Sequence, residues 1–123
     1  MIIGVGIDLI EVEKIEKDIL SEFYLLKVFT EQEITECKSV INSAERFAGK
    51  FAAKEAFMKA IARGIRQEVW FTQIEVLNND KGRPYIQVTG EAQDSLIVLD
   101  VKNIHVSITH TRQHAAAVVI VEK

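Results

Sequence analysis

Residues 46–60 read RFAGKFAAKEAFMKA, and they say most about the chain because they mix a helical apolar pattern with one carboxylate and three lysines. Glu55 and Lys59 are four residues apart and share a helical face, with Phe51 one turn earlier on the same side. The pattern predicts one long helix over about residues 43–63, and Gly64 is expected to end it. Two interpretations fit: a solvated amphipathic helix, or a helix that carries a charged site.

The start of the chain holds a second carboxylate, Asp8. Residues 2–8 (IIGVGID) alternate and predict a strand. Its two faces carry Ile3, Val5 and Ile7 on one side, and Gly4, Gly6 and Asp8 on the other. The bare backbone at the glycines suits either a closely packed helix or an approaching ligand. A dinucleotide-binding fingerprint is excluded because Leu9 occupies its third glycine position.

The composition indicates one globular domain over residues 1–123. The net charge of −3 argues against sequence-independent binding to nucleic acid or to an anionic membrane. The single cysteine, Cys37, leaves neither a disulfide framework nor a paired thiolate metal site. Because no export signal or membrane-length apolar stretch is present, we expect a cytoplasmic protein.

The remaining patterns predict an α+β fold with an antiparallel sheet packed on the long central helix and on short helices. Thr30 and Glu33 have the spacing of a capping box. The turn NNDKG at residues 78–82 joins two strands as a hairpin. The expected helices are a short one to about residue 20, then 30–39 and 91–99, and the expected strands are 72–77, 84–89, 103–110 and 115–121.

The last hairpin places polar groups in register along one face. Alternation puts His105, Ser107, Thr109 and Thr111 on the side opposite Ile104, Val106 and Ile108. This polar face is either open to solvent or covered by a partner chain, in which case it forms a wall of hydrogen-bonding groups. The histidines lack the spacing of a zinc site.

Four motifs in this order resemble the holo-acyl-carrier-protein synthases, the small, typically trimeric members of the 4'-phosphopantetheinyl transferase superfamily. The motifs are GVGID at 4–8, RFAGKFAAKEAFMKA at 46–60, GRPY at 82–85 and HVSITHT at 105–111. The similarity runs from Ile2 almost to the C-terminus. It implies a homotrimer with sites at subunit interfaces. It also implies transfer of the phosphopantetheine arm of coenzyme A to a serine of apo-acyl carrier protein, a step that supports fatty acid biosynthesis and leaves adenosine 3',5'-bisphosphate.

The resemblance also implies the catalytic residues. Asp8 and Glu55 match the family's two metal-binding carboxylates, and Mg²⁺ suits them because it prefers a few carboxylate oxygens together with phosphate oxygens and waters. Lys59 matches the lysine that contacts the phosphates and is expected to stabilise the charge that develops on the departing phosphate. The acceptor of the serine proton stays open between Glu55 and a water near Asp8.

The coenzyme contacts come from the same resemblance. Many relatives carry arginine where Lys50 stands, so a fork-like phosphate contact is absent there. Lys14, on the first helix, is the expected contact with the carrier protein. The matched coenzyme-binding positions are Lys50, Lys54, Lys59, Gly82, Pro84, His105, Ser107 and Thr109.

Two segments depart from the family pattern. Residues 41–43 (INS) stand where relatives often have a basic pair, so the contact with the 3'-phosphate is expected either to be weaker or to come from Lys38 and Arg46. Residues 62–64 (ARG) replace a Gly-Thr-Gly segment, and Arg63 is expected to project into the mouth of the site.

Two other function classes fit the same residues. A nucleotide pyrophosphate hydrolase would use the carboxylates, a metal and the lysines to activate water. A non-catalytic coenzyme-binding module would bind the ligand without turnover. Release of phosphopantetheine in the absence of carrier would indicate the first, and binding without any activity would indicate the second.

Overall fold

A computed structural model describes all 123 residues, Met1–Lys123. Two short 3₁₀ turns, Ala62–Gly64 and Phe71–Gln73, flank the loop after the longest helix. The other elements, in chain order, are β1 (Ile2–Glu11), α1 (Val12–Asp18), α2 (Glu22–Val28), α3 (Glu31–Lys38), α4 (Ser43–Ala60), β2 (Ile74–Asn78), β3 (Pro84–Val88), α5 (Gly90–Val98), β4 (Asn103–His110) and β5 (His114–Glu122).

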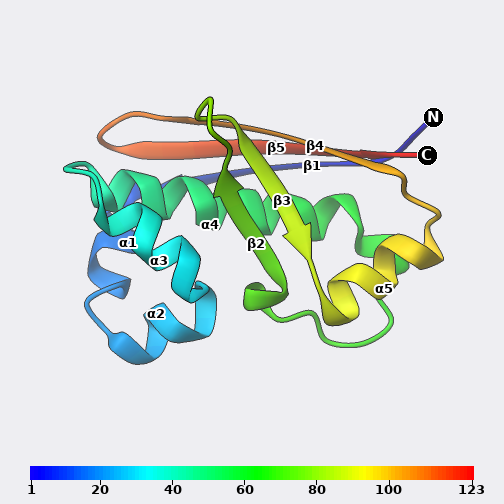
Figure 1. Cartoon of the computed structure of the whole chain (residues 1–123), viewed down its shortest axis with the longest axis horizontal. Coiled ribbons are helices and arrows are strands. Elements are labelled where there is room, and N and C mark those ends of the chain that lie inside the picture. The colour runs from blue at the N-terminus through cyan, green and yellow to red at the C-terminus, as the bar shows by residue number, and fades with distance from the viewer.

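The helix α4 lies between a three-stranded sheet and a hairpin (Figure 1). The sheet is antiparallel with the order β1-β5-β4, so β1 and β4 form its two edges. The hairpin of β2 and β3 crosses α4 on the other side, α1, α2 and α3 gather at one end, and α5 lies at the other. None of the helices has the length and apolar character needed to cross a bilayer.

The contact between β1 and α4 is the closest in the fold. A Cβ atom on Gly6 would overlap the carbonyl oxygen of Ala56, and one on Gly4 would overlap that of Ala60. Two strand residues advance about 6.6 Å and four helix residues about 6 Å, so the contact repeats in register along both elements. The glycines therefore serve the packing of a helix.

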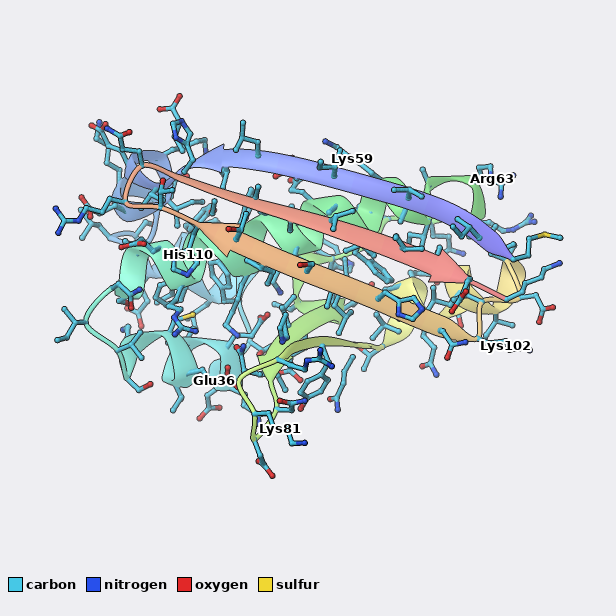
Figure 2. All side chains as sticks on the ribbon, turned by 90° about the horizontal axis from the view of Figure 1, so that it is seen from above. Glu36, Lys59, Arg63, Lys81, Lys102 and His110 are labelled. Carbon is cyan, nitrogen blue, oxygen red and sulfur yellow. The ribbon has the colours of Figure 1, made fainter.

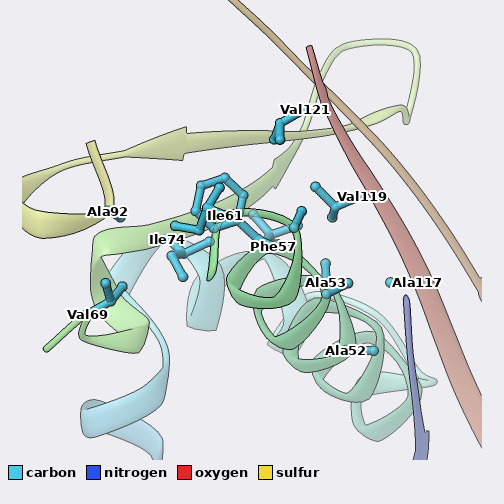
Figure 3. Close-up of a cluster of buried hydrophobic side chains, with 13 residues drawn as sticks. Ala52, Ala53, Phe57, Ile61, Val69, Ile74, Ala92, Ala117, Val119 and Val121 are labelled. Atoms are coloured by element: carbon cyan, nitrogen blue, oxygen red, sulfur yellow. The ribbon is translucent and has the colours of Figure 1, made fainter. Parts of the chain in front are cut away.

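Two apolar clusters fill the interior. The larger one lies between α4, β2 and β5, with Phe57 and Ile61 of the helix end against Ile74, Val119 and Val121 (Figure 3). The smaller one joins α4 to the three short helices, and Phe29 meets Phe47 edge to face with ring centroids 4.9 Å apart. Both clusters use α4, so this helix organises the whole domain.

The predicted α+β architecture is confirmed, and the elements differ in detail. The capping box of Thr30 and Glu33 forms at the start of α3. The long helix stops at Ala60, three residues early, because the chain tightens into a 3₁₀ turn in which Gly64 packs against α5. Strand β1 continues to Glu11 because β5 pairs with it as far as His114. The sequence analysis missed α2.

Replacing Gly6 by alanine tests the close contact. Because the new methyl group would meet backbone atoms of α4, we expect Gly6→Ala to lower the free energy of unfolding by about 2 kcal/mol or more in urea denaturation. Gly49→Ala is the matched control: its methyl group meets only a side-chain methyl of Ile108, and alanine favours a helix by about 1 kcal/mol. Equal stabilities of the two variants would contradict this packing.

Candidate active site

Asp8, Glu55 and Lys59 meet where β1 crosses α4. Asp8 follows Gly6 on the inward face of β1, so the contact of Gly6 with Ala56 carries Asp8 toward Glu55. The ammonium group of Lys59 donates to the Ile7 carbonyl at 2.9 Å and to Asp8 Oδ1 at 3.3 Å. The three residues that the sequence analysis assigned to catalysis are therefore neighbours in the fold.

The negative charge of Asp8 acts on Glu55. Partial burial raises the pKa of Glu55, and the negative charge of Asp8 raises it further, against the opposing effects of Lys59 and Lys14. Two acids held together in this way repel each other when both are ionised, and a divalent cation between them would relieve that repulsion.

The set of donors fits a hard cation such as Mg²⁺. The structure holds no group of three or more His, Cys, Asp or Glu side chains placed to bind a metal. Asp8 and Glu55 would supply two carboxylates. The other ligands would be phosphate oxygens and waters, as is common for Mg²⁺.

A cavity of about 220 Å³ lies on the other flank of α4. Residues of β4 and of the turn before β3 form part of its wall, and its cationic groups are Arg46 and Lys50. His110 Nδ1 is 2.9 Å from Glu45 Oε1 at its wall. The lining residues are Glu45, Arg46, Gly49, Lys50, Asn78, Gly82, Pro84, Ile108 and His110.

The carboxylates and the cavity belong to opposite edges of the sheet. Figure 2 shows Lys59 and Arg63 along β1, whereas His110 and Glu36 lie on the side of β4. Strand β5 runs between the two edges, and α4 lies beneath it. A single chain does not bring the two groups of residues to one place.

The structure contradicts the prediction that Lys54 contacts the coenzyme. Its side chain is 0% exposed, and its ammonium group donates to Glu33 Oε1 at 2.9 Å, to the Phe71 carbonyl and to the Ile74 carbonyl. Burial lowers the pKa of Lys54, and the Glu33 carboxylate opposes that shift. Because all three protons are used and no surface is accessible, Lys54 cannot contact the coenzyme.

Glu33 is the partner that fixes this buried lysine. Besides Lys54, its carboxylate accepts from the backbone N–H groups of Thr30 and Val76, each at 2.8 Å. One carboxylate thus joins the start of α3, the middle of α4 and strand β2. This pair holds together the framework on which the site is built.

The predicted contacts in the last hairpin all lie on one face of β4. His105, Ser107 and Thr109 are exposed on the outer face of β4, away from the cavity that Gly82 and Pro84 line. His105 instead pairs with Glu122 at 2.7 Å. Within one chain, these three residues lie apart from the cavity, so their predicted role depends on a neighbouring subunit.

His110 does line the cavity, and the sequence analysis overlooked it. The signal was present in the alternation, since His110 has the same parity as Ile108 and so points to the inward face of β4. Glu45 was overlooked as well, because its role depends on contact with a strand 65 residues away.

The structure also shows where the remaining predicted residues lie. Lys50 lines the cavity, as does Arg46, whereas Lys38 is not among the lining residues. Lys14 is exposed on α1 and pairs with Asp18 at 2.7 Å. Arg63 does not project into a mouth, because its guanidinium group donates to the Ile3 carbonyl at 2.9 Å.

Known proteins resemble this chain over its whole length. The sequence model of the 4'-phosphopantetheinyl transferase superfamily matches residues 4–119. A holo-[acyl-carrier-protein] synthase from Halothermothrix orenii is 42% identical over 125 residues, which cover 100% of this chain and 99% of the relative.

Solved structures agree with this similarity. A holo-(acyl-carrier-protein) synthase from Bacillus anthracis in complex with CoA (3',5'-ADP) is 39% identical, with a TM-score of 0.78 over 98% of this chain and 96% of that chain. The Helicobacter pylori synthase in complex with coenzyme A is 30% identical, with a TM-score of 0.79 over 96% and 99%.

Two matched lysine substitutions separate a structural lysine from a site lysine. Lys54→Met leaves Glu33 as an unpaired buried charge, so we expect a loss of about 3–5 kcal/mol in the free energy of unfolding. Lys59→Met removes a side chain that is 55% exposed, and we expect a loss of less than about 1 kcal/mol.

Urea denaturation measures both losses. The double variant Lys54→Met with Glu33→Leu should regain part of the lost stability because it removes the orphaned charge. If Lys54→Met were as stable as the unsubstituted protein, the structural role of Lys54 would be wrong.

Proposed function

The chain belongs to the 4'-phosphopantetheinyl transferase superfamily, and we propose that it moves the 4'-phosphopantetheine group of coenzyme A onto a serine of apo-acyl carrier protein. Adenosine 3',5'-bisphosphate is the second product. The observation that carries this proposal is the meeting of Asp8, Glu55 and Lys59 at one point of the fold. Full-length similarity to holo-[acyl-carrier-protein] synthases supports it.

The reaction exchanges one phosphate ester for another. The serine hydroxyl oxygen of the carrier bonds to the phosphorus next to pantetheine, and the bond from that phosphorus to the bridging oxygen of the pyrophosphate breaks. The electron pair leaves with adenosine 3',5'-bisphosphate. The hydroxyl proton passes to an acceptor on this flank, for which Glu55 and a water near Asp8 are the two candidates.

The residues divide this work by charge. Asp8 and Glu55 would hold Mg²⁺, which when bound offsets the charge of the pyrophosphate. Lys59 extends a compact cation beside them: two of its protons go to Ile7 and Asp8, its side chain is half exposed, and its third proton can meet the departing phosphate. Lys59 is anchored in that position by the Ile7 carbonyl.

The cavity beside β4 suits the nucleotide end of the coenzyme. Arg46 and Lys50 present cations to a phosphate, while Gly82 and Pro84 form a backbone wall. Its volume of about 220 Å³ is below the range of about 300–1,000 Å³ typical of pockets that enclose a whole drug-sized ligand. The cavity therefore accepts a part of coenzyme A, and the rest must extend beyond it.

Assembly into a homotrimer would unite the two halves of the site. The outer face of β1 exposes Val5, Ile7 and Leu9, the last two at 67% and 68%. A row of apolar side chains on a sheet face is an interaction surface, because soluble proteins seldom leave such a face uncovered. A neighbouring copy on this face would place its cavity near the Asp8–Glu55 pair, and Ser107 and Thr109 would then border the bound coenzyme.

The carrier protein is expected to dock at α1 and α2. Lys14 lies close enough to Glu55 to influence its pKa, so this end of α1 borders the catalytic flank. Phe23 and Leu26 of α2 are exposed and add an apolar contact.

A cytoplasmic location fits the single cysteine, because Cys37 is buried and unpaired. Burial raises the pKa of its thiol to about 12.

The intact mass of apo-acyl carrier protein after incubation with coenzyme A and Mg²⁺ tests the activity. We expect a phosphopantetheine mass increment that disappears with a chelator. Glu55→Gln and Lys59→Ala should slow the transfer by a factor on the order of 10² or more, since each removes charge stabilisation at the reacting phosphate. Lys102→Ala, which removes an exposed lysine paired with Asp100, should leave the rate unchanged.

Three outcomes would contradict this function. No mass increment while a known synthase modifies the same carrier would refute the transfer. Phosphopantetheine release without carrier would indicate a hydrolase. Coenzyme binding that survives Glu55→Gln, without activity in either protein, would indicate a binding module.

Mixing two inactive variants tests the shared site. Glu55→Gln disables the carboxylate half and Arg46→Ala the cavity half, and trimers coexpressed with two affinity tags combine them. If neighbouring chains share each site, random mixing restores about a quarter of the sites, so activity should recover to that order. Light scattering should report three copies.

A site within one chain predicts a different result. Mixed assemblies would then stay as inactive as the parent variants. A monomer with full activity in light scattering would also exclude the shared site.

A further inference from the structure

Asn78 joins the two walls of the cavity beside β4. Its Nδ2 donates to the Gly82 carbonyl at 3.0 Å, and its Oδ1 accepts from the Lys50 ammonium group at 3.4 Å. All three residues line the cavity. One amide side chain at the end of β2 therefore connects the helix wall to the turn wall.

The Lys50 ammonium group is held mainly from behind. It donates to the Val76 carbonyl at 2.6 Å and to Glu36 Oε1 at 3.1 Å, and only 6% of its side chain is exposed. The bond to Asn78 is the longest of the three. It is therefore the one that Lys50 can share with an anion while its other two bonds keep it in place.

The turn after Asn78 has its own internal bonds. Asn79 Oδ1 accepts from the backbone N–H groups of Lys81 at 2.9 Å and Arg83 at 3.0 Å. Gly82 lies in the left-handed region, with φ of +79°, which favours glycine. Asn79 thus sets the shape of the turn, whereas Asn78 sets where the turn lies relative to α4.

We propose that Asn78 is a positioning residue of the coenzyme cavity, because its amide fixes the spacing between the Lys50 ammonium group and the Gly82 turn. This inference rests on the proposed function. Asn78 lies on the flank of β4, whereas the reacting phosphate belongs to the flank of β1. Its loss therefore weakens coenzyme binding and leaves the chemical step intact.

Kinetics and calorimetry on the full-length protein test this role. For Asn78→Ala we expect about a tenfold rise in KM for coenzyme A and in Kd for adenosine 3',5'-bisphosphate, with kcat changed less than about twofold. Asn78→Asp keeps an oxygen beside Lys50 and loses the donor to Gly82, so it should also weaken binding. Gln93→Ala is the control, because Gln93 is an exposed amide on α5 that does not line the cavity.

Several results would overturn the inference. They are an unchanged KM in Asn78→Ala, a loss confined to kcat, or wild-type binding in Asn78→Asp. If the unsubstituted protein turns over coenzyme A and binds adenosine 3',5'-bisphosphate normally, these results refute the role of Asn78 alone. If the unsubstituted protein neither binds the nucleotide nor transfers the group, the proposed function fails as well.

Discussion

The packing of two glycines against a helix backbone fixes how the first strand meets the central helix, and the site follows from that contact. Gly4 and Gly6 let β1 lie directly on α4, opposite Ala60 and Ala56. Because strand and helix advance at nearly the same rate there, the next inward residue of the strand comes to the helix face that carries Glu55. The place of Asp8 in the site is thus set by residues that have no side chains, and the chemistry depends on the packing.

The three lysines of α4 show how one helix serves different purposes. Lys54 is wholly buried and neutralises Glu33, Lys50 is held at a cavity wall, and Lys59 reaches solvent beside the carboxylates. Lys50 and Lys54, four residues apart, share the face toward β2 and donate to its Val76 and Ile74 carbonyls, whereas Lys59, five residues further, turns toward β1. Burying an ion pair costs desolvation, and here hydrogen bonds from three elements offset that cost.

Features that depend on local sequence were predictable, and those that depend on distant partners were not. The capping box at Thr30 and the alternation in β4 follow from spacing alone. The burial of Lys54 could not be foreseen because α3 and β2 close over it from elsewhere in the chain. Helix α2 was missed because its exposed Phe23 and Leu26 obscure the apolar stripe formed by Leu25 and Val28. The placement of the carboxylates and the cavity at opposite edges of the sheet could be predicted only from the order of its strands.

Lys59 and Arg63 also affect the exposed edge of the sheet at β1. An edge strand offers free carbonyl groups to any other extended chain, which makes it a starting point for uncontrolled sheet growth. Lys59 covers the carbonyl of Ile7 and Arg63 that of Ile3, four residues apart on the same border. Side chains from α4 and from the 3₁₀ turn after it thereby occupy two carbonyls that another extended chain would need for strand addition.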